Sequence, residues 1–199
     1  MDVYEAVTKR RSIREFKDIP VPYDVLEKCV NAARLAPSAM NSQLCEYIIV
    51  DDEQLLPQVL DAVGSWAGQP RPKEGWSPEH RPKAYIITLI NSQLEKELGG
   101  NIRWTSYDVG MAAENMMLVA LEQGVGSCPI ASFQQDKLKQ VLNIPDKYEI
   151  ALGLVLGFPD ESPVLEVATD PIKRWIDSNG VRHIPKRKLE DITHRNRFP

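Results

Sequence analysis

The feature that most constrains the fold of this sequence is an apolar segment from about residue 103 to residue 123. At the helical period, its apolar side chains surround nearly the whole circumference and are densest at 111–113 and 116–121. A helix of this kind must be covered on all sides, either in a core or at a subunit interface. Because a chain of 199 residues has difficulty wrapping such a helix completely, the sequence predicts that the protein dimerises.

Helices and buried strands are predicted to alternate along the rest of the chain. Three short apolar runs indicate buried strands, at 47–50, 84–90 and 149–156. Four shorter segments indicate helices, at 2–9, 22–35, 53–63 and 134–142. This mixture is typical of α+β and of α/β folds, and both stay open at this point. After Gly157 the chain is predicted to be long, irregular and basic.

Composition and charge exclude several classes of protein. The sequence is 43% hydrophobic and 26% charged, as in a folded soluble protein. Its 24 basic and 28 acidic residues give a formal net charge of −4, which argues against a nucleic-acid binder or a binder of anionic membranes. No apolar run approaches the ~18 residues of a membrane span, and the first residues lack the layout of a signal peptide. We therefore expect a cytoplasmic protein.

The cysteines and histidines indicate neither a metal site nor a disulfide framework. The 3 cysteines are odd in number, widely spaced and without a Cys-x-x-Cys pair. The 3 histidines lack the spacing of metal ligands. Cys128 is interpreted as a small buried apolar residue rather than a nucleophile. We expect no bound metal.

A cluster of cations follows the first predicted helix, in the segment Arg10-Arg11-Ser12-Ile13-Arg14. In an extended chain, side chains alternate, so Arg10, Ser12 and Arg14 share one face. Two guanidinium groups around a hydroxyl make a receptor for a phosphate or another planar anion. Taken alone, the segment is more typical of a solvated basic turn. A second basic cluster, 186–188, gains meaning only if it meets the first.

The loop after the second predicted helix, residues 36–43, has the sequence Ala-Pro-Ser-Ala-Met-Asn-Ser-Gln. Its small side chains, hydroxyls and amides suit close contact with a planar heterocycle. A plain capping turn explains the same residues without any ligand.

Together, the order and spacing of these motifs resemble the nitroreductase family over nearly the whole chain. The resemblance includes the helix motif at 108–118 and the segment 124–130. It implies FMN-dependent NAD(P)H oxidoreductases with an α+β sandwich fold, a central and mostly antiparallel sheet, and helices flanking it. It also implies an intertwined homodimer with two FMN sites at its interface. The expected organisation is a single domain, 1–199, with 160–199 as an extended C-terminal arm.

The resemblance also assigns roles to residues by position. It places Arg10 and Ser12 at the FMN phosphate and ribityl chain, Arg11 beside them, and Arg14 at the pyrimidine edge of the ring. The partner's flavin would be contacted by Pro37, Ser38, Ala39 and Asn41. The N5 side would be lined by Ile130, Ala131 and Ser132. A C-terminal pair for the phosphate would be Lys186 and Arg187, or Lys188 with the register shifted by one. No side chain is assigned as catalytic.

Two departures from the family pattern concern the substrate pocket. Leu44-Cys45 stands where many relatives have Pro-Trp, and Ala131-Ser132 stands where some have Glu-Gly. Trp66 and Trp76, in the loop 64–82, are interpreted either as a substrate cap or as loop anchors.

The expected reaction is ping-pong hydride transfer from NADH or NADPH through FMN to a nitroaromatic, a quinone or a similar acceptor. The alternatives are dehalogenation, azoline oxidation or flavin fragmentation on the same fold, and a flavin-binding protein without turnover.

Overall fold

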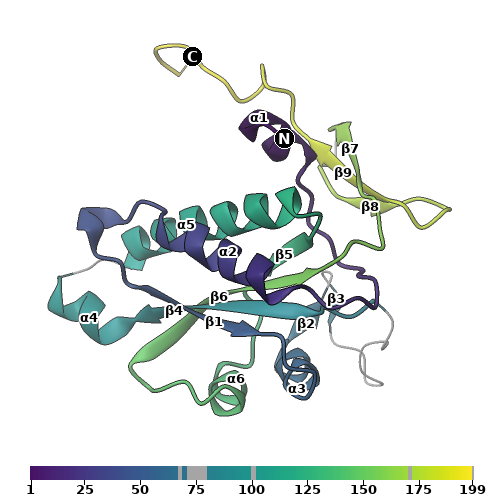
Figure 1. Ribbon diagram of the computed structural model, residues 1–199. Helices are drawn as coiled ribbons and strands as arrows, with labels where there is room; N and C mark the ends of the chain where they lie inside the picture. Colours follow the sequence, from purple (N-terminus) through teal and green to yellow (C-terminus); the bar gives the residue numbers. More distant parts are fainter. Residues whose placement is uncertain (67–68, 71–79, 100–101, 170–171, 199) are drawn as a thin grey trace. The chain divides into compact units, whose positions relative to one another are not determined.

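The computed structural model describes residues 1–66, 69–70, 80–99, 102–169 and 172–198 (Figure 1). It divides into two units, Met1–Asp160 and Glu161–Pro199, here called unit 1 and unit 2. The boundary lies beside the start of the expected C-terminal arm. That the two units form one domain stays a prediction, because their relative positions are not determined.

Unit 1 is built on a four-stranded sheet with the order β1-β4-β6-β5. All three pairings are antiparallel. The strands are β1 (Cys45–Val50), β4 (Ala84–Asn91), β6 (Tyr148–Gly157) and β5 (Gly126–Ile130). Seven of the eight residues of β4 are buried, which explains its continuous apolar run. The antiparallel sheet with flanking helices is α+β, one of the two classes predicted.

One face of this sheet is covered by α2 (Tyr23–Arg34) and α5 (Ile102–Glu122) (Figure 1). The apolar stripe of α2 packs with α5 and with the sheet in a cluster that includes Leu26, Cys29, Ile86, Met116 and Leu154. The short helix α1 (Val3–Lys9) packs against α5. Both long helices agree with their predicted ranges to within about one residue.

The other face is covered by α3 (Leu56–Asp61) and α6 (Gln135–Val141). Val59 and Leu138 pack there against Phe16, Tyr85 and Val155. The sequence missed β5 and the helix α4 (Ser92–Glu97), whose N-terminus is capped by Asn91. It also missed the small pair β2 (Ser65–Trp66) and β3 (Gln69–Pro70). Trp76 and most of the loop 64–82 lie outside the described residues.

The helix α5 is covered on part of its circumference within one chain. Ala112, Ala113 and Met116 are buried, whereas a stripe of three side chains at helical spacing is exposed: Trp104 at 47%, Tyr107 at 53% and Met111 at 38%. This stripe is the part of the helix that a second protomer would have to cover. No helix in the described part of the chain is both long enough and apolar enough to cross a membrane.

Unit 2 contains a three-stranded sheet with the order β7-β9-β8. Its strands are β7 (Val164–Val167), β8 (Trp175–Ile176) and β9 (Arg182–Lys186). The strands β7 and β9 are parallel, and β8 forms a hairpin with β9 that turns at Gly180, where φ is 80°. The prediction of an irregular chain after Gly157 is therefore wrong here, because strands of two to five residues give too little periodicity to detect.

Candidate functional site

The segment after α1 lies along the edge strand β5. Ser12 forms a parallel bridge with Ser127, and the Ile13 N–H donates to the Ser127 carbonyl at 2.9 Å. The Ile13 side chain is buried and fills the space beside Gly126. A Cβ added to Gly126 would lie only 2.7 Å from Cγ1 of Ile13. Ile13 is buried, as its predicted inward position requires, whereas Arg10, Arg11, Ser12 and Arg14 are all half-buried. That Arg10, Ser12 and Arg14 share one face stays a prediction.

Arg10 is anchored to the helix α5. Its Nε donates to Oε1 of Glu114 at 2.9 Å, and its Nη1 lies 4.0 Å from Sδ of Met117. The Arg10 side chain is 27% exposed. The guanidinium is therefore fixed in direction while several of its five N–H donors remain for another acceptor.

Arg11 and Arg14 complete the cationic cluster. Nη1 of Arg11 donates to the Arg10 carbonyl at 2.5 Å, and Nη1 of Arg14 donates to the Ser12 carbonyl at 3.1 Å. Burial, and then the charge of Arg10, lowers the pKa of Arg11 below its ordinary value. Like charges held close together and partly desolvated favour an anion beside them. The chemistry of this segment therefore suits an anion, as the sequence predicts.

The loop after α2 contains a short 3-10 turn, Ala39–Asn41, and unusual backbone angles. Three non-glycine residues have left-handed φ values: Met40 at 54°, Asn41 at 55° and Gln43 at 49°. Such conformations cost on the order of 1–3 kcal/mol each and persist only where the surroundings impose them.

Hydrogen bonds to α5 and within the loop hold this loop in place. The Ala39 N–H donates to both carboxylate oxygens of Asp108 on α5, each at 3.2 Å, and Asp108 is 6% exposed. The Gln43 N–H donates to Oγ of Ser38 at 3.2 Å. Pro37 and Asn41 are left exposed. The loop is thus a fixed platform rather than a loose connection.

The turn after β5 is braced by the segment that follows α3. Ile130 ends the strand, and Ala131 and Ser132 are exposed. The Gly64 N–H donates to the Ser132 carbonyl at 2.8 Å. The departure at Leu44 has a structural reason, since Leu44 is 4% exposed and packs with Ile90. Cys128 is buried, as predicted.

The C-terminal basic pair lies in unit 2. Lys186 ends β9, and its carbonyl accepts from the Ala168 N–H at 2.7 Å. Nη2 of Arg187 donates to the Asp191 carbonyl at 2.9 Å. Both basic side chains belong to exposed residues. Whether they meet the arginines of unit 1 stays a prediction, because the two units are not placed relative to each other.

Within unit 1, the arginine segment and the loop contact α5 at different levels. The loop is held at Asp108 and Arg10 at Glu114, six residues later, which is about 9 Å along a helix. The sequence did not assign roles to Asp108 and Glu114. The available signal was the presence of acidic residues within an otherwise apolar helix, where unpaired charges are rare.

Comparisons with known proteins agree with this geometry. A family model described as "Nitroreductase family" matches residues 7–158. An NADPH-dependent oxidoreductase of Staphylococcus aureus is 25% identical over 205 residues, which cover 98% of this chain and 74% of the relative.

Solved structures give the same result. An FMN-dependent nitroreductase of Clostridium difficile is similar with a TM-score of 0.68 and 25% identity, over 98% of this chain and 100% of that one. An NADPH:FMN oxidoreductase of Vibrio harveyi, complexed with NAD+, shares the fold with a TM-score of 0.71 at 19% identity, over 98% and 77% of the two chains. Because the family model spans most of its length, this chain belongs to the nitroreductase family.

Proposed function

We propose that this protein is an FMN-dependent oxidoreductase that carries hydride from NAD(P)H to a small oxidised acceptor, such as a nitroaromatic or a quinone. Family membership supports the reaction class, as do the FMN-dependent nitroreductase and the NADPH-dependent oxidoreductase that the chain resembles. The observation that carries the proposal is the cluster of three arginines on the edge of β5.

The arginine cluster fits the phosphate of FMN. Arg10 is oriented by Glu114, and Arg11 lies close enough for the two charges to interact unfavourably. A phosphate with nearly two negative charges would relieve this repulsion and accept charge-assisted hydrogen bonds. Ser12 adds a hydroxyl on the same face. Lys186 and Arg187 would complete the phosphate site from unit 2.

Arg14 is proposed to lie at the pyrimidine edge of the flavin ring. When bound, FMN supplies the redox chemistry, receiving hydride from the nicotinamide and passing it to the acceptor. A fixed guanidinium at the pyrimidine edge would stabilise the negative charge that reduction places there. The exposed turn Ile130, Ala131 and Ser132 would present backbone N–H groups to the opposite, N5 side of the ring.

The platform formed by Pro37, Ser38, Ala39 and Asn41 is proposed to contact the flavin of a second protomer in a homodimer. Within one chain, this platform and the arginine segment contact α5 at levels about 9 Å apart. The exposed stripe of α5, with Trp104, Tyr107 and Met111, would be buried by the partner. Each site would therefore use residues of both chains.

Two measurements on the purified protein test the proposal. We expect a flavin absorption spectrum, either as purified or after incubation with FMN, and parallel double-reciprocal lines with NAD(P)H and a quinone, as ping-pong kinetics require. A protein that stays colourless with added FMN would contradict it. FMN binding without consumption of NADH or NADPH would favour a flavin-binding protein without turnover.

Two variants, each of which removes one cation, sharpen the test. Arg10→Gln should weaken FMN binding by about tenfold or more, since it removes a charge-assisted contact to the phosphate. Lys28→Gln is the control, because Lys28 is exposed on α2, its Nζ lies 3.9 Å from Oδ2 of Asp24, and it belongs neither to the arginine segment nor to the platform. Equal FMN affinity in the two variants would contradict the assigned phosphate site.

A further inference from the structure

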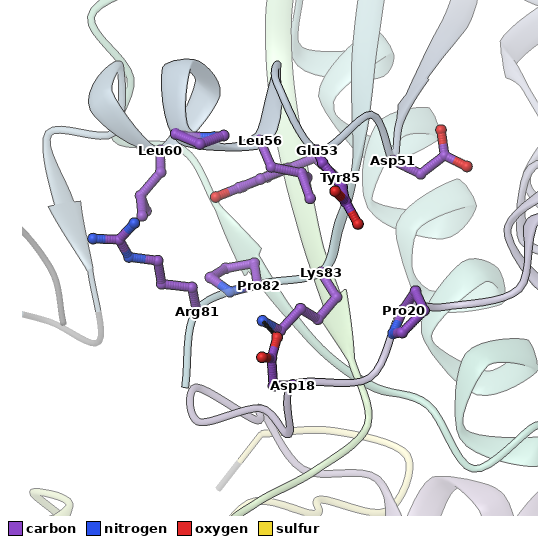
Figure 2. Close-up of a pocket in the computed structure, with 11 residues that line it drawn as sticks. Asp18, Pro20, Asp51, Glu53, Leu56, Leu60, Arg81, Pro82, Lys83 and Tyr85 are labelled. Carbon is purple, nitrogen blue, oxygen red and sulfur yellow. Dashed lines mark hydrogen bonds and ion pairs between the residues drawn. The ribbon is translucent and has the colours of Figure 1, made fainter. Parts of the chain in front are cut away.

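A second feature of unit 1, separate from the residues assigned to FMN, is a cavity of about 280 Å³. It lies between α3, the start of β4 and the segment that follows Phe16 (Figure 2). Its apolar wall includes Leu56, Leu60 and Pro82. The volume is near the lower end of the about 300–1,000 Å³ that is typical of small-molecule sites.

Tyr85 lines this cavity, and its buried hydroxyl has no hydrogen-bond partner among the described residues. Tyr85 is 1% exposed and lies on the central strand β4. A buried hydroxyl without a partner is costly and rare, and phenylalanine would fill the same space without this cost. Burial raises the pKa of Tyr85, so the hydroxyl stays protonated and can donate. Within the described part of the chain this donor therefore has no acceptor, and a ligand in the cavity would supply one.

The charges around the cavity differ between its two sides. Figure 2 shows Tyr85 directed toward the side where Leu60 and Arg81 lie. Arg81 is close enough for its charge to act on Tyr85, and a guanidinium has five donors to share among several acceptors. Lys83, which also lines the cavity, is already paired with Asp18.

The opposite side of the cavity carries the carboxylates of Asp51 and Glu53 (Figure 2). Neither makes a hydrogen bond or an ion pair with another side chain in the described part of the chain. These carboxylates would repel a ligand that is only anionic, and they favour a cation on their side. A ligand that suits both sides of the cavity carries one negative and one positive charge.

We propose that this cavity binds a small zwitterion of the class of α-amino acids with an aliphatic side chain. Its carboxylate accepts from the Tyr85 hydroxyl on the Arg81 side, and its ammonium group faces Asp51 and Glu53. Its side chain packs on Leu56, Leu60 and Pro82. This site is independent of the proposed flavin chemistry.

Titration calorimetry with three probes tests the charge pattern on the purified protein. Leucine should bind, whereas 4-methylpentanoate, which lacks the ammonium group, and 3-methylbutylamine, which lacks the carboxylate, should each bind at least about tenfold more weakly. Absence of leucine binding at millimolar concentration would overturn the proposal. So would equal affinity for leucine and either analogue.

A pair of tyrosine variants tests the role of the hydroxyl. Tyr85→Phe should weaken leucine binding by about tenfold and leave the melting temperature equal or higher, because the removed hydroxyl has no partner. Tyr148→Phe is the control, since the Tyr148 hydroxyl donates to Oε1 of Glu46 at 2.6 Å and does not line the cavity. It should lower the melting temperature without changing leucine affinity. Unchanged leucine affinity in Tyr85→Phe would overturn the proposal.

Discussion

The two sheets of this protein are stabilised in different ways. The sheet of unit 1 is closed by apolar side chains on both faces, and Ile86 and Val155 are completely buried. The sheet of unit 2 leaves its apolar side chains largely exposed, with Val164 at 43%, Trp175 at 48% and Ile176 at 57%. Unit 1 therefore carries its own core, whereas unit 2 lacks one and depends more on polar contacts.

Those polar contacts centre on His183. Its ring stacks on Trp175 with centroids 3.9 Å apart, and its Nδ1 lies 3.0 Å from Oε2 of Glu166. Its Nε2 lies 3.7 Å from Oδ2 of Asp177, an ion-pair distance too long for a hydrogen bond. The Trp175 indole N–H donates to Glu166 at 2.7 Å. In unit 2, polar contacts therefore stabilise the sheet, as apolar packing stabilises the sheet of unit 1.

The two units also differ in the side chains whose pKa values the fold shifts. In unit 1, burial raises the pKa of Cys29 to about 11. In unit 2, the Trp175 indole N–H lowers the pKa of Glu166, and the Val181 N–H lowers that of Asp177. Alkaline conditions should therefore act on unit 1. Acidic conditions should act on unit 2 and also on Glu5 and Asp18 of unit 1, whose pKa values are lowered by Lys9 and Lys83.

The largest expected effect is that of removing an apolar side chain from unit 1. Phe16 is completely buried in the cluster with Val59 and Val155. Phe16→Ala should cost about 3–5 kcal/mol of unfolding free energy, measured by urea denaturation. Trp175→Ala in unit 2, where the ring is half-exposed, should cost clearly less. Equal losses would break the contrast between the two units.

Alanine substitution at two glycines, one in each unit, tests the same contrast between the units with a smaller expected loss of unfolding free energy. At Gly157, an added Cβ would lie 2.7 Å from Cδ1 of the buried Phe16 ring, whereas nothing lies within 4 Å at Gly180. Gly157→Ala should therefore cost about 1–3 kcal/mol through overpacking. Gly180→Ala should cost about 1–2 kcal/mol through its left-handed backbone alone. In Phe16→Ala, which removes Cγ and Cδ1 of the ring, a second mutation at Gly157 should become cheaper, and one at Gly180 should not.

Sequence reasoning succeeded where a signal repeats within one element. The periodic stripe of α2 and the long apolar run of α5 located both helices, and the run at 84–90 located β4. The strand β5 was missed because Gly126 and Pro129 weaken its local signal, and pairing with β6 determines it instead. The strands of unit 2 were missed because two to five residues give too little periodicity, and because the pairing of β7 with β9 joins segments that are distant in the sequence.

The features of the candidate site divide in the same way, into those that depend on neighbouring residues and those that depend on distant ones. Alternation predicted the shared face of Arg10, Ser12 and Arg14, because it depends on neighbouring residues only. The roles of Asp108 and Glu114 depend on partners 69 and 104 residues away, so the local pattern could mark these two residues as unusual but could not identify their partners. Tyr85 lies in an apolar run of the sequence, and no local pattern there indicated that it lines a cavity.

The alkaline response should come from unit 1. An unfolded cysteine releases its proton around its ordinary pKa of 9.0, whereas folded Cys29 keeps it until about 11. The folded state binds more protons in this interval, so stability falls as the pH rises from 9 to 11, by on the order of 2 kcal/mol. Urea denaturation at pH 8, 9.5 and 11 measures the loss. In Cys29→Ala the slope should be shallower; an unchanged slope would contradict the assignment.

The acid response of unit 2 should be smaller. Because the pKa values of Glu166 and Asp177 are lowered in the fold, their stabilisation is present above the ordinary values of 4.5 and 3.8 and is lost as the pH falls through the folded values. The NMR signal of the Trp175 indole N–H, followed from pH 6 to pH 3, should shift before the amide signals of β4 change. Glu166→Gln keeps an acceptor for the indole without the charge and should flatten this shift. Simultaneous loss of both sets of signals would show that the two sheets unfold as one, and that polar contacts give unit 2 no separate response to acid.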